Sequence, residues 1–153
     1  MEDRVQKAVE LFKSGFNCSQ SVVAAYADMY GFTHEQAVRM SASFGGGIGR
    51  MRETCGAACG MFLLAGLETG ATEATDREGK AANYAVVQEL AAEFKKRNGS
   101  LICSELLGLK PKDPVSTVPE ERTSQYYAKR PCAKMVEEAA RIWGEYLQKN
   151  SKS

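Results

Sequence analysis

The chain has 153 residues, the size of one domain and long enough to bury a hydrophobic core without disulfide or metal staples. Its 20 basic and 19 acidic residues leave a formal net charge of +1, which excludes the strongly basic surface typical of nucleic-acid-binding proteins. No segment approaches the roughly 20 consecutive apolar residues of a membrane span. The first residues are charged and unlike a signal peptide, so we expect one cytoplasmic domain over residues 1–150 and a frayed tail at 151–153.

Apolar residues recur at helical spacing along most of the chain, and glycines or capping residues separate the recurring segments. No segment shows the alternation of β-branched and polar residues that predicts a strand. The expected helices are 3–14, 18–30, 34–44, 55–68, 76–97, 101–107 and 131–148, with a further short helix opening at Thr117 and running toward Tyr127. We therefore predict an all-α fold, a single compact domain of about seven helices joined by short turns.

Local signals place several of these helix starts. Three four-residue sequences have the form of a capping box, in which the first and last side chains each bond the other residue's backbone N–H. They begin at Asn17, Thr33 and Thr75. In the helix after Thr75, the residues Tyr84 and Phe94 fall on the stripe that we expect to be buried.

Two glycines, Gly60 and Gly66, interrupt the apolar helix 55–68. Each costs roughly 1 kcal/mol of helix propensity relative to alanine. Their presence is explained if another backbone packs against this helix, and we expect a close approach at these positions.

The five cysteines carry the main functional signal, because an odd number in a chain without an export signal favours metal binding or thiol chemistry over a disulfide framework. Four of them fall in the first turns of separate predicted helices: Cys18, Cys55, Cys103 and Cys132. Helix N-termini favour negative charge, so we predict that these four ends converge on one pocket suited to thiolates or to a thiolate-ligated cluster. Cys59 lies one turn beyond Cys55, where we expect core packing or an accessory thiol.

Cys55 stands at the point where a flexible loop becomes a helix. Thr54 is the expected N-cap, and Arg50 and Arg52 add positive charge nearby. We therefore predict that Cys55 is the most acidic free thiol of the chain. The glycine run 45–49 lets the loop approach this helix start without side chains in the way.

Each of these residue types also has a plainer interpretation. A single buried cysteine is most often an unreactive core residue. The glycine run lacks the sequence of a phosphate-binding loop, so no nucleotide is expected. His34, the only histidine, is expected on the surface, so the chain lacks the ligands for a histidine-based zinc site. Glu120 is expected on a solvated face, and Tyr126 in the core or at an interface.

Five motifs, in this order along the chain, resemble the C_GCAxxG_C_C family of small proteins with a Cys-Gly-Ala-x-x-Gly motif and four characteristic cysteines. The motifs are Asn17-Cys18-Ser19-Gln20, the segment Phe44 to Arg50, Cys55-Gly56-Ala57-Ala58-Cys59-Gly60, the segment Cys103 to Gly108, and Pro131-Cys132. The resemblance covers nearly the whole chain.

The resemblance implies a redox-active protein, with Cys18, Cys55, Cys103 and Cys132 as the four family cysteines and Cys59 at a variable position. It also implies a redox or transport-associated protein as partner. A similar domain in split-Soret cytochromes associates its cysteines with an iron–sulfur site, which makes an iron–sulfur cluster or another thiolate-bound metal the implied cofactor. This chain has no Cys-x-x-Cys-His sequence, so no haem is expected.

Two classes of function stay open at this point. In the first, the four cysteines ligate an iron–sulfur or other metal centre, or they undergo reversible thiol–disulfide exchange. In the second, the chain is a non-catalytic helical binding or accessory module with structural cysteines, and a link to a transport system is one form of this alternative. The sequence leaves open whether the protein is an enzyme and whether it forms a homo-oligomer.

Overall fold

The computed structural model describes residues 1–110 and 115–150. Over these ranges the chain forms eight α-helices and two short 3-10 helices, with one isolated bridge and no strand, so the predicted all-α fold is confirmed. The α-helices are α1 (Glu2–Lys13), α2 (Cys18–Tyr26), α3 (His34–Ser41), α4 (Gly56–Thr69), α5 (Arg77–Asn98), α6 (Cys103–Leu107), α7 (Ser124–Lys129) and α8 (Cys132–Lys149). The 3-10 helices η1 (Ala27–Tyr30) and η2 (Ala42–Phe44) extend α2 and α3. The predicted tail, 151–153, lies outside the described residues.

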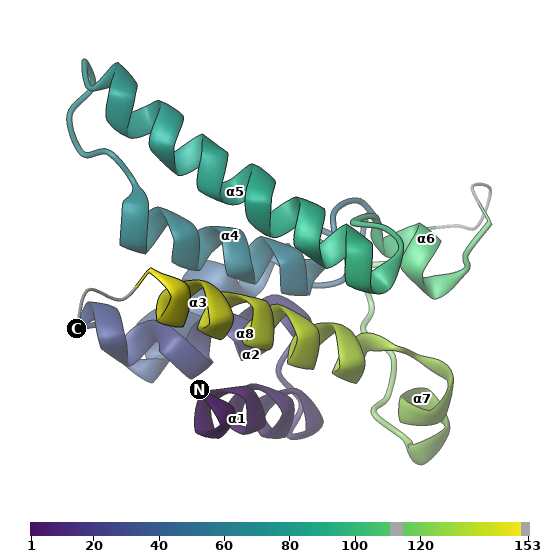
Figure 1. Ribbon diagram of the computed structural model, residues 1–153. Coiled ribbons are helices and arrows are strands. Elements are labelled where there is room, and N and C mark those ends of the chain that lie inside the picture. Colours follow the sequence, from purple (N-terminus) through teal and green to yellow (C-terminus); the bar gives the residue numbers. More distant parts are fainter. Residues whose placement is uncertain (111–114, 151–153) are drawn as a thin grey trace.

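Helix α8 packs against α1, α2, α4 and α5; in Figure 1 it lies between α4 above and α1 below, with α2 behind it. Helix α4 packs against α2, α5 and α8, and its contact with α2 is the most extensive in the fold. The start of α1 and the end of α8 lie at one end of the bundle, whereas α6 and α7 lie at the other (Figure 1). The end that carries α6 and α7 also carries the candidate site.

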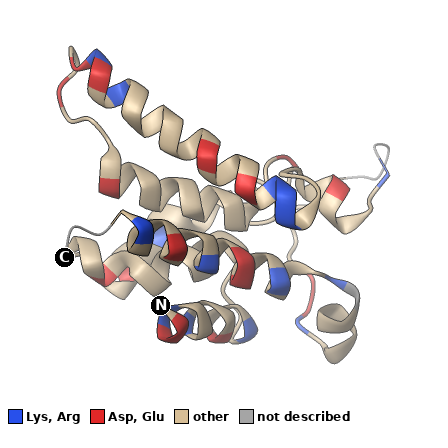
Figure 2. Ribbon diagram, viewed as in Figure 1, with Lys and Arg blue, Asp and Glu red and all other residues tan. Residues whose placement is uncertain are grey.

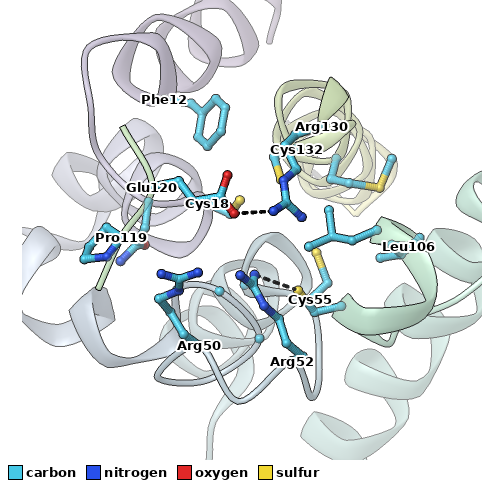
Figure 3. Close-up of a pocket in the computed structure, with 18 of the residues that line it drawn as sticks. Phe12, Cys18, Arg50, Arg52, Cys55, Leu106, Pro119, Glu120, Arg130 and Cys132 are labelled. Atoms are coloured by element: carbon cyan, nitrogen blue, oxygen red, sulfur yellow. Dashed lines mark hydrogen bonds and ion pairs between the residues drawn. The ribbon is translucent and has the colours of Figure 1, made fainter. Parts of the chain in front are cut away.

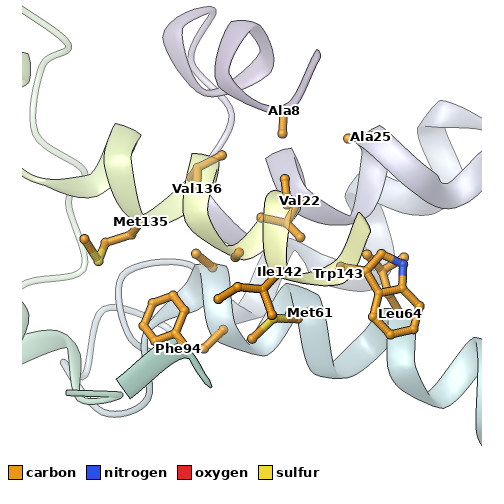
Figure 4. Close-up of a cluster of buried hydrophobic side chains, with 14 of the residues drawn as sticks. Ala8, Val22, Ala25, Met61, Leu64, Phe94, Met135, Val136, Ile142 and Trp143 are labelled. Carbon is orange, nitrogen blue, oxygen red and sulfur yellow. The ribbon is translucent and has the colours of Figure 1, made fainter. Parts of the chain in front are cut away.

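The hydrophobic core forms where these helices meet. Figure 4 shows the cluster of buried side chains around α8, which includes Met61, Phe94 and Trp143. Tyr26 is buried in the same cluster, and its hydroxyl donates a hydrogen bond of 2.7 Å to the carbonyl oxygen of Ala140. One core therefore joins α2, α4, α5 and α8.

The distribution of charged residues agrees with this packing. Figure 2 shows residues of both signs on α1, α5 and α8, whereas α4 carries only Glu68, near its C-terminal end. The near absence of charge on α4 fits its position against three other helices. None of the helices in the described ranges combines the length and the apolarity that crossing a membrane requires.

The capping boxes predicted at Asn17 and Thr33 are confirmed, each with hydrogen bonds in both directions. The third box is wrong by one residue. Asp76, not Thr75, caps α5, because its carboxylate accepts the backbone N–H of Gly79 at 2.8 Å.

Two further predictions are wrong. Helix α7 begins at Ser124 rather than near Thr117, because Thr123 provides the N-cap. The side chain of Tyr84 is 60 % exposed, because only the C-terminal half of α5, including Phe94, packs into the core.

The two glycines of α4 differ in their surroundings. A Cβ atom at Gly60 would lie 3.0 Å from the carbonyl oxygen of Ser19 and 3.0 Å from Cβ of Val22, so the predicted close approach is confirmed there. A Cβ atom at Gly66 would meet no atom within 4 Å, so the same prediction is wrong for Gly66.

This difference predicts opposite effects of one substitution on stability. Gly66→Ala should raise the free energy of unfolding by about 1 kcal/mol, because alanine is the better helix former and nothing opposes its methyl group. Gly60→Ala gains the same propensity, but it forces α2 away from α4 at a cost of about 1–3 kcal/mol, so the net effect should be destabilising. Urea unfolding followed by circular dichroism measures both variants. Equal stabilisation by the two substitutions would contradict the close packing at Gly60.

Candidate functional site

A cavity of about 300 Å³ opens at the end of the bundle that carries α6 and α7. Four of the five cysteines line it: Cys18, Cys55, Cys103 and Cys132 (Figure 3). Three of them are the first residues of α2, α6 and α8, and the fourth directly precedes α4. The prediction that these four positions converge on one pocket is therefore confirmed.

Glycines let these helix starts come together. A Cβ atom at Gly56 would lie 2.8 Å from the carbonyl oxygen of Phe44 and 3.4 Å from Cβ of Cys18. A Cβ atom at Gly47 would lie 2.6 Å from Cβ of Cys103. Contacts below 3 Å leave no room for a methyl group, so the close approach requires residues without a side chain at both positions.

The loop between η2 and α4 has an unusual backbone. The residues with positive φ in segment 46–52 are Gly46, Gly47, Ile48, Gly49, Arg50 and Arg52. The three that are not glycine have φ values of 62–66°, a conformation that costs such residues on the order of 1 kcal/mol each. A hydrogen bond of 2.8 Å from the Glu53 N–H to the Gly47 carbonyl oxygen helps to hold the loop. In this conformation, the side chains of Arg50 and Arg52 extend toward the middle of the cavity (Figure 3).

The backbone around Cys55 differs from the prediction. Thr54 forms an isolated antiparallel bridge with Ile102, and Cys55 itself occupies the N-cap position of α4. Beside this bridge, the Cys103 N–H donates a hydrogen bond of 2.6 Å to the carbonyl oxygen of Glu53. Thr54 as N-cap is therefore wrong, because its backbone is used in pairing with the segment that precedes α6. The pairing ties two of the cysteine-bearing helix starts together.

Cys18 and Cys132 are partly buried and line the same cavity, where their contact is the main influence on the pKa of both thiols. Donation from Cys18 is the main cause that lowers the pKa of Cys132 to about 7. Burial opposes this shift, whereas a hydrogen bond from Tyr126 and the charges of Arg130 and Arg122 support it. The same contact, together with burial, raises the pKa of Cys18 well above its ordinary value. Near neutral pH, Cys132 is therefore the residue that carries a thiolate, and Cys18 is its thiol donor.

Burial raises the pKa of the other three thiols. It raises the pKa of Cys55 to about 12, although two backbone N–H groups at the start of α4 oppose the shift, and it raises that of Cys59 to about 11. Burial also raises the pKa of Cys103, against the opposing effect of Arg52, whose Nη1 atom lies 3.7 Å from Cys103 Sγ. The prediction that Cys55 is the most acidic thiol is therefore wrong. The residue Cys55 is only 5 % exposed, and the nearby Arg52 contacts Cys103 instead.

The four cavity thiols form one electrostatic group, because each pair among them is close enough for the two charges to interact. Thiolates are the donors that iron–sulfur clusters and soft metal ions prefer, so the chemistry of the donor set suits a metal. Within the described ranges, however, no three histidine, cysteine or acidic side chains are grouped closely enough to hold a metal ion. All five cysteines are free thiols. That these four cysteines ligate a metal centre therefore stays a prediction.

Cys59 does not belong to the lining of the cavity. It is buried one turn into α4, where its Sγ atom lies 3.9 Å from the carbonyl oxygen of Thr54. This position matches the core packing expected from the sequence and separates Cys59 from the other four thiols.

Several cavity residues were not identified from the sequence. They come from the segment around α7 and are Glu120, Arg122, Tyr126 and Arg130. Glu120, expected on a solvated face, forms an ion pair with Arg130 at the cavity (Figure 3). The position of Arg130, two residues before Cys132, is a local signal that could have identified it. Arg122 has no such signal, because it reaches the site through a hydrogen bond of 2.7 Å to the carbonyl oxygen of Phe12 on α1.

Fold and site together define a small all-α protein with a thiol-lined cavity at one end of its helical bundle. The family described as "Putative redox-active protein (C_GCAxxG_C_C)" matches residues 16–146, a range that includes all four cavity cysteines. The chain belongs to this family, and the resemblance seen in the sequence is confirmed. No curated protein and no solved structure matches the chain.

The environment of Cys132 predicts how its reactivity depends on pH. Because the folded protein lowers its pKa to about 7, the rate of alkylation by iodoacetamide should rise between pH 6 and 8 and level off above that range. The midpoint should move upward in Cys18→Ala, which removes the main cause of the lowered pKa, and by less in Tyr126→Phe. Mass spectrometry of the labelled peptides gives the rate for each cysteine.

Cys59→Ser is the matched control, because this thiol lies outside the cavity and its loss should leave the Cys132 midpoint unchanged. Faster alkylation of Cys55 than of Cys132 at pH 7, or a Cys132 midpoint near the ordinary thiol value of about 8.5, would contradict this description of the site.

Proposed function

We propose that this protein is a thiol–disulfide redox protein in which Cys132 attacks a substrate disulfide and Cys18 resolves the mixed disulfide. The observation that supports the proposal most strongly is that these two thiols line one cavity and interact there, one with a lowered and one with a raised pKa. Such a pair supplies a thiolate near neutral pH and a second thiol within reach of the first. Membership of a family described as redox-active agrees with this chemistry.

The reaction transfers two electrons from the dithiol to the substrate. The Cys132 thiolate attacks one sulfur of a disulfide R–S–S–R′, which forms a Cys132–S–S–R bond and expels R′S⁻. Cys18 then attacks the sulfur of Cys132, which forms the Cys18–Cys132 disulfide and expels RS⁻. The proton released by Cys18 and one from solvent complete the two thiol products. The protein is oxidised from dithiol to disulfide, and the substrate is reduced to two thiols.

The environment of the pair fits this order of events. As long as Cys132 is a thiolate, its charge raises the pKa of Cys18 and keeps that residue protonated. Formation of the mixed disulfide removes this charge, so the pKa of Cys18 falls and its thiolate becomes available for the second step. Tyr126 and Arg130 stabilise the Cys132 thiolate, which is the nucleophile in the forward reaction. In the reverse reaction the same thiolate is the leaving group, and they stabilise it there too.

A direct test follows the oxidation of fully reduced protein by the neutral disulfide 2,2′-dithiodipyridine under argon. Wild type should release about two equivalents of pyridinethione in its fast phase and end with a Cys18–Cys132 disulfide. Cys18→Ser should release about one equivalent and retain a mixed disulfide on Cys132, because the resolving thiol is missing. Cys132→Ser should lose the fast phase, with a rate at pH 7 lower by on the order of tenfold or more.

Cys59→Ser is again the control and should react like wild type. A fast phase that survives in Cys132→Ser would refute the assignment of the nucleophile. Slow reaction of all cysteines would instead favour the non-catalytic helical module. Stoichiometric iron and inorganic sulfide in protein purified without oxygen would favour the iron–sulfur alternative.

A further inference from the structure

The walls of the cavity carry an excess of positive charge. The arginines that line it are Arg50, Arg52, Arg122 and Arg130, and the only carboxylate in the described lining is that of Glu120. Glu120 is already paired with Arg130. Arg122 donates hydrogen bonds to the carbonyl oxygens of Phe12 and Phe16 and lies over the Phe12 ring, so its guanidinium is committed to holding α7 against α1.

Arg50 and Arg52 differ from the other two. In the part of the chain that the structure describes, neither has a carboxylate partner. Arg50 donates to the carbonyl oxygen of Val118, and Arg52 has one nitrogen 3.7 Å from Cys103 Sγ. Each guanidinium has five N–H donors, so most of the donors on both residues stay available. Figure 3 shows both side chains directed to the middle of the cavity, on the side of Cys18.

The loop conformation keeps these two guanidinium groups at the cavity. Both arginines have positive φ, which is uncommon for residues with a side chain. The remaining wall of the cavity is apolar, with Phe12, Leu106 and Met135 among its residues. A ligand that suits these walls has a short apolar body and a negatively charged end, because the fork of an arginine matches a carboxylate.

We propose that the cavity selects anionic disulfides, small compounds whose ends carry carboxylates, over neutral and cationic disulfides. The inference rests on the proposed thiol–disulfide function and names its class of substrate. In the bound substrate, Arg50 and Arg52 hold a carboxylate while the disulfide lies against Cys132. The electron transfer is the two-step exchange described above, and the substrate is the oxidant.

Three disulfides of similar size and different charge test the inference: 3,3′-dithiodipropionate, 2-hydroxyethyl disulfide and cystamine. The fast oxidation of reduced protein is measured with each compound and divided by the rate of the same compound with dithiothreitol, which removes differences in intrinsic reactivity. We expect the normalised rate to be at least about tenfold higher for the dianion than for the dication, with the neutral compound between them. The advantage of the dianion should shrink in 0.5 M salt, where exposed charges are screened beyond about 4 Å.

Variants then assign the preference to residues. Arg50→Gln and Arg52→Gln should each lower the ratio of the dianion rate to the neutral rate by several-fold, and Arg50→Lys should restore part of it. Lys149→Gln removes one positive charge at the far end of α8 and is the control, since its side chain is 74 % exposed beside Glu89. Circular dichroism checks that each variant is folded. The salt series on wild type keeps the inference testable if the loop does not tolerate a substitution.

The outcomes separate this inference from the proposed function. Equal normalised rates for the three disulfides, or a preference for cystamine, would overturn anionic selection and leave the exchange chemistry in place. Failure of all three compounds to oxidise Cys18 and Cys132 would refute the proposed function itself. A dianion preference that persists unchanged in both arginine variants would refute the role given to these residues.

Discussion

The close approach of three backbone segments at glycine positions is the constraint on which the cavity depends. Gly56 brings the start of α4 against η2 and Cys18, and Gly47 brings the loop before α4 against Cys103. A side chain at either position would push apart the segments that carry the cysteines. The left-handed backbone of the same loop also turns Arg50 into the cavity. The glycine-containing loop before α4 therefore brings both the cysteine thiols and the positive charge of Arg50 to the cavity.

The competition between burial and local electrostatics decides which thiol ionises. A helix N-terminus contributes roughly 0.3–1 kcal/mol to a nearby negative charge, which is less than the 1.36 kcal/mol of one pKa unit. At Cys55 this is too little to offset burial, which raises the pKa to about 12. At Cys132 the interaction with Cys18, supported by Tyr126 and two arginines, outweighs burial and lowers the pKa to about 7. The four cysteines thus meet because they lie at helix starts that converge. Which of them ionises near neutral pH is decided by the neighbouring side chains that lower its pKa.

Much of the fold could be predicted because its signals are local. The capping boxes at Asn17 and Thr33 lie within four residues, and the helical position of Cys18 follows from the first of them. The acidity of Cys132 could not be predicted in this way. It depends first on Cys18 and then on Tyr126 and Arg122, and Arg122 is held at the site by its bond to the Phe12 carbonyl oxygen; all of these are contacts between different elements of the packed fold. The sequence pattern near Cys55 pointed to the wrong thiol for the same reason, since burial is a property of the packed fold.

The central claim is that Cys18 and Cys132 form the redox pair of this protein. The most direct measurement equilibrates the protein anaerobically in a series of redox buffers and maps every disulfide by mass spectrometry at each potential. The account predicts that the Cys18–Cys132 disulfide is the first to form as the buffer becomes more oxidising and that it forms reversibly as a two-electron couple. A first disulfide between Cys55 and Cys103, or oxidation that leaves Cys132 unpaired, would contradict it.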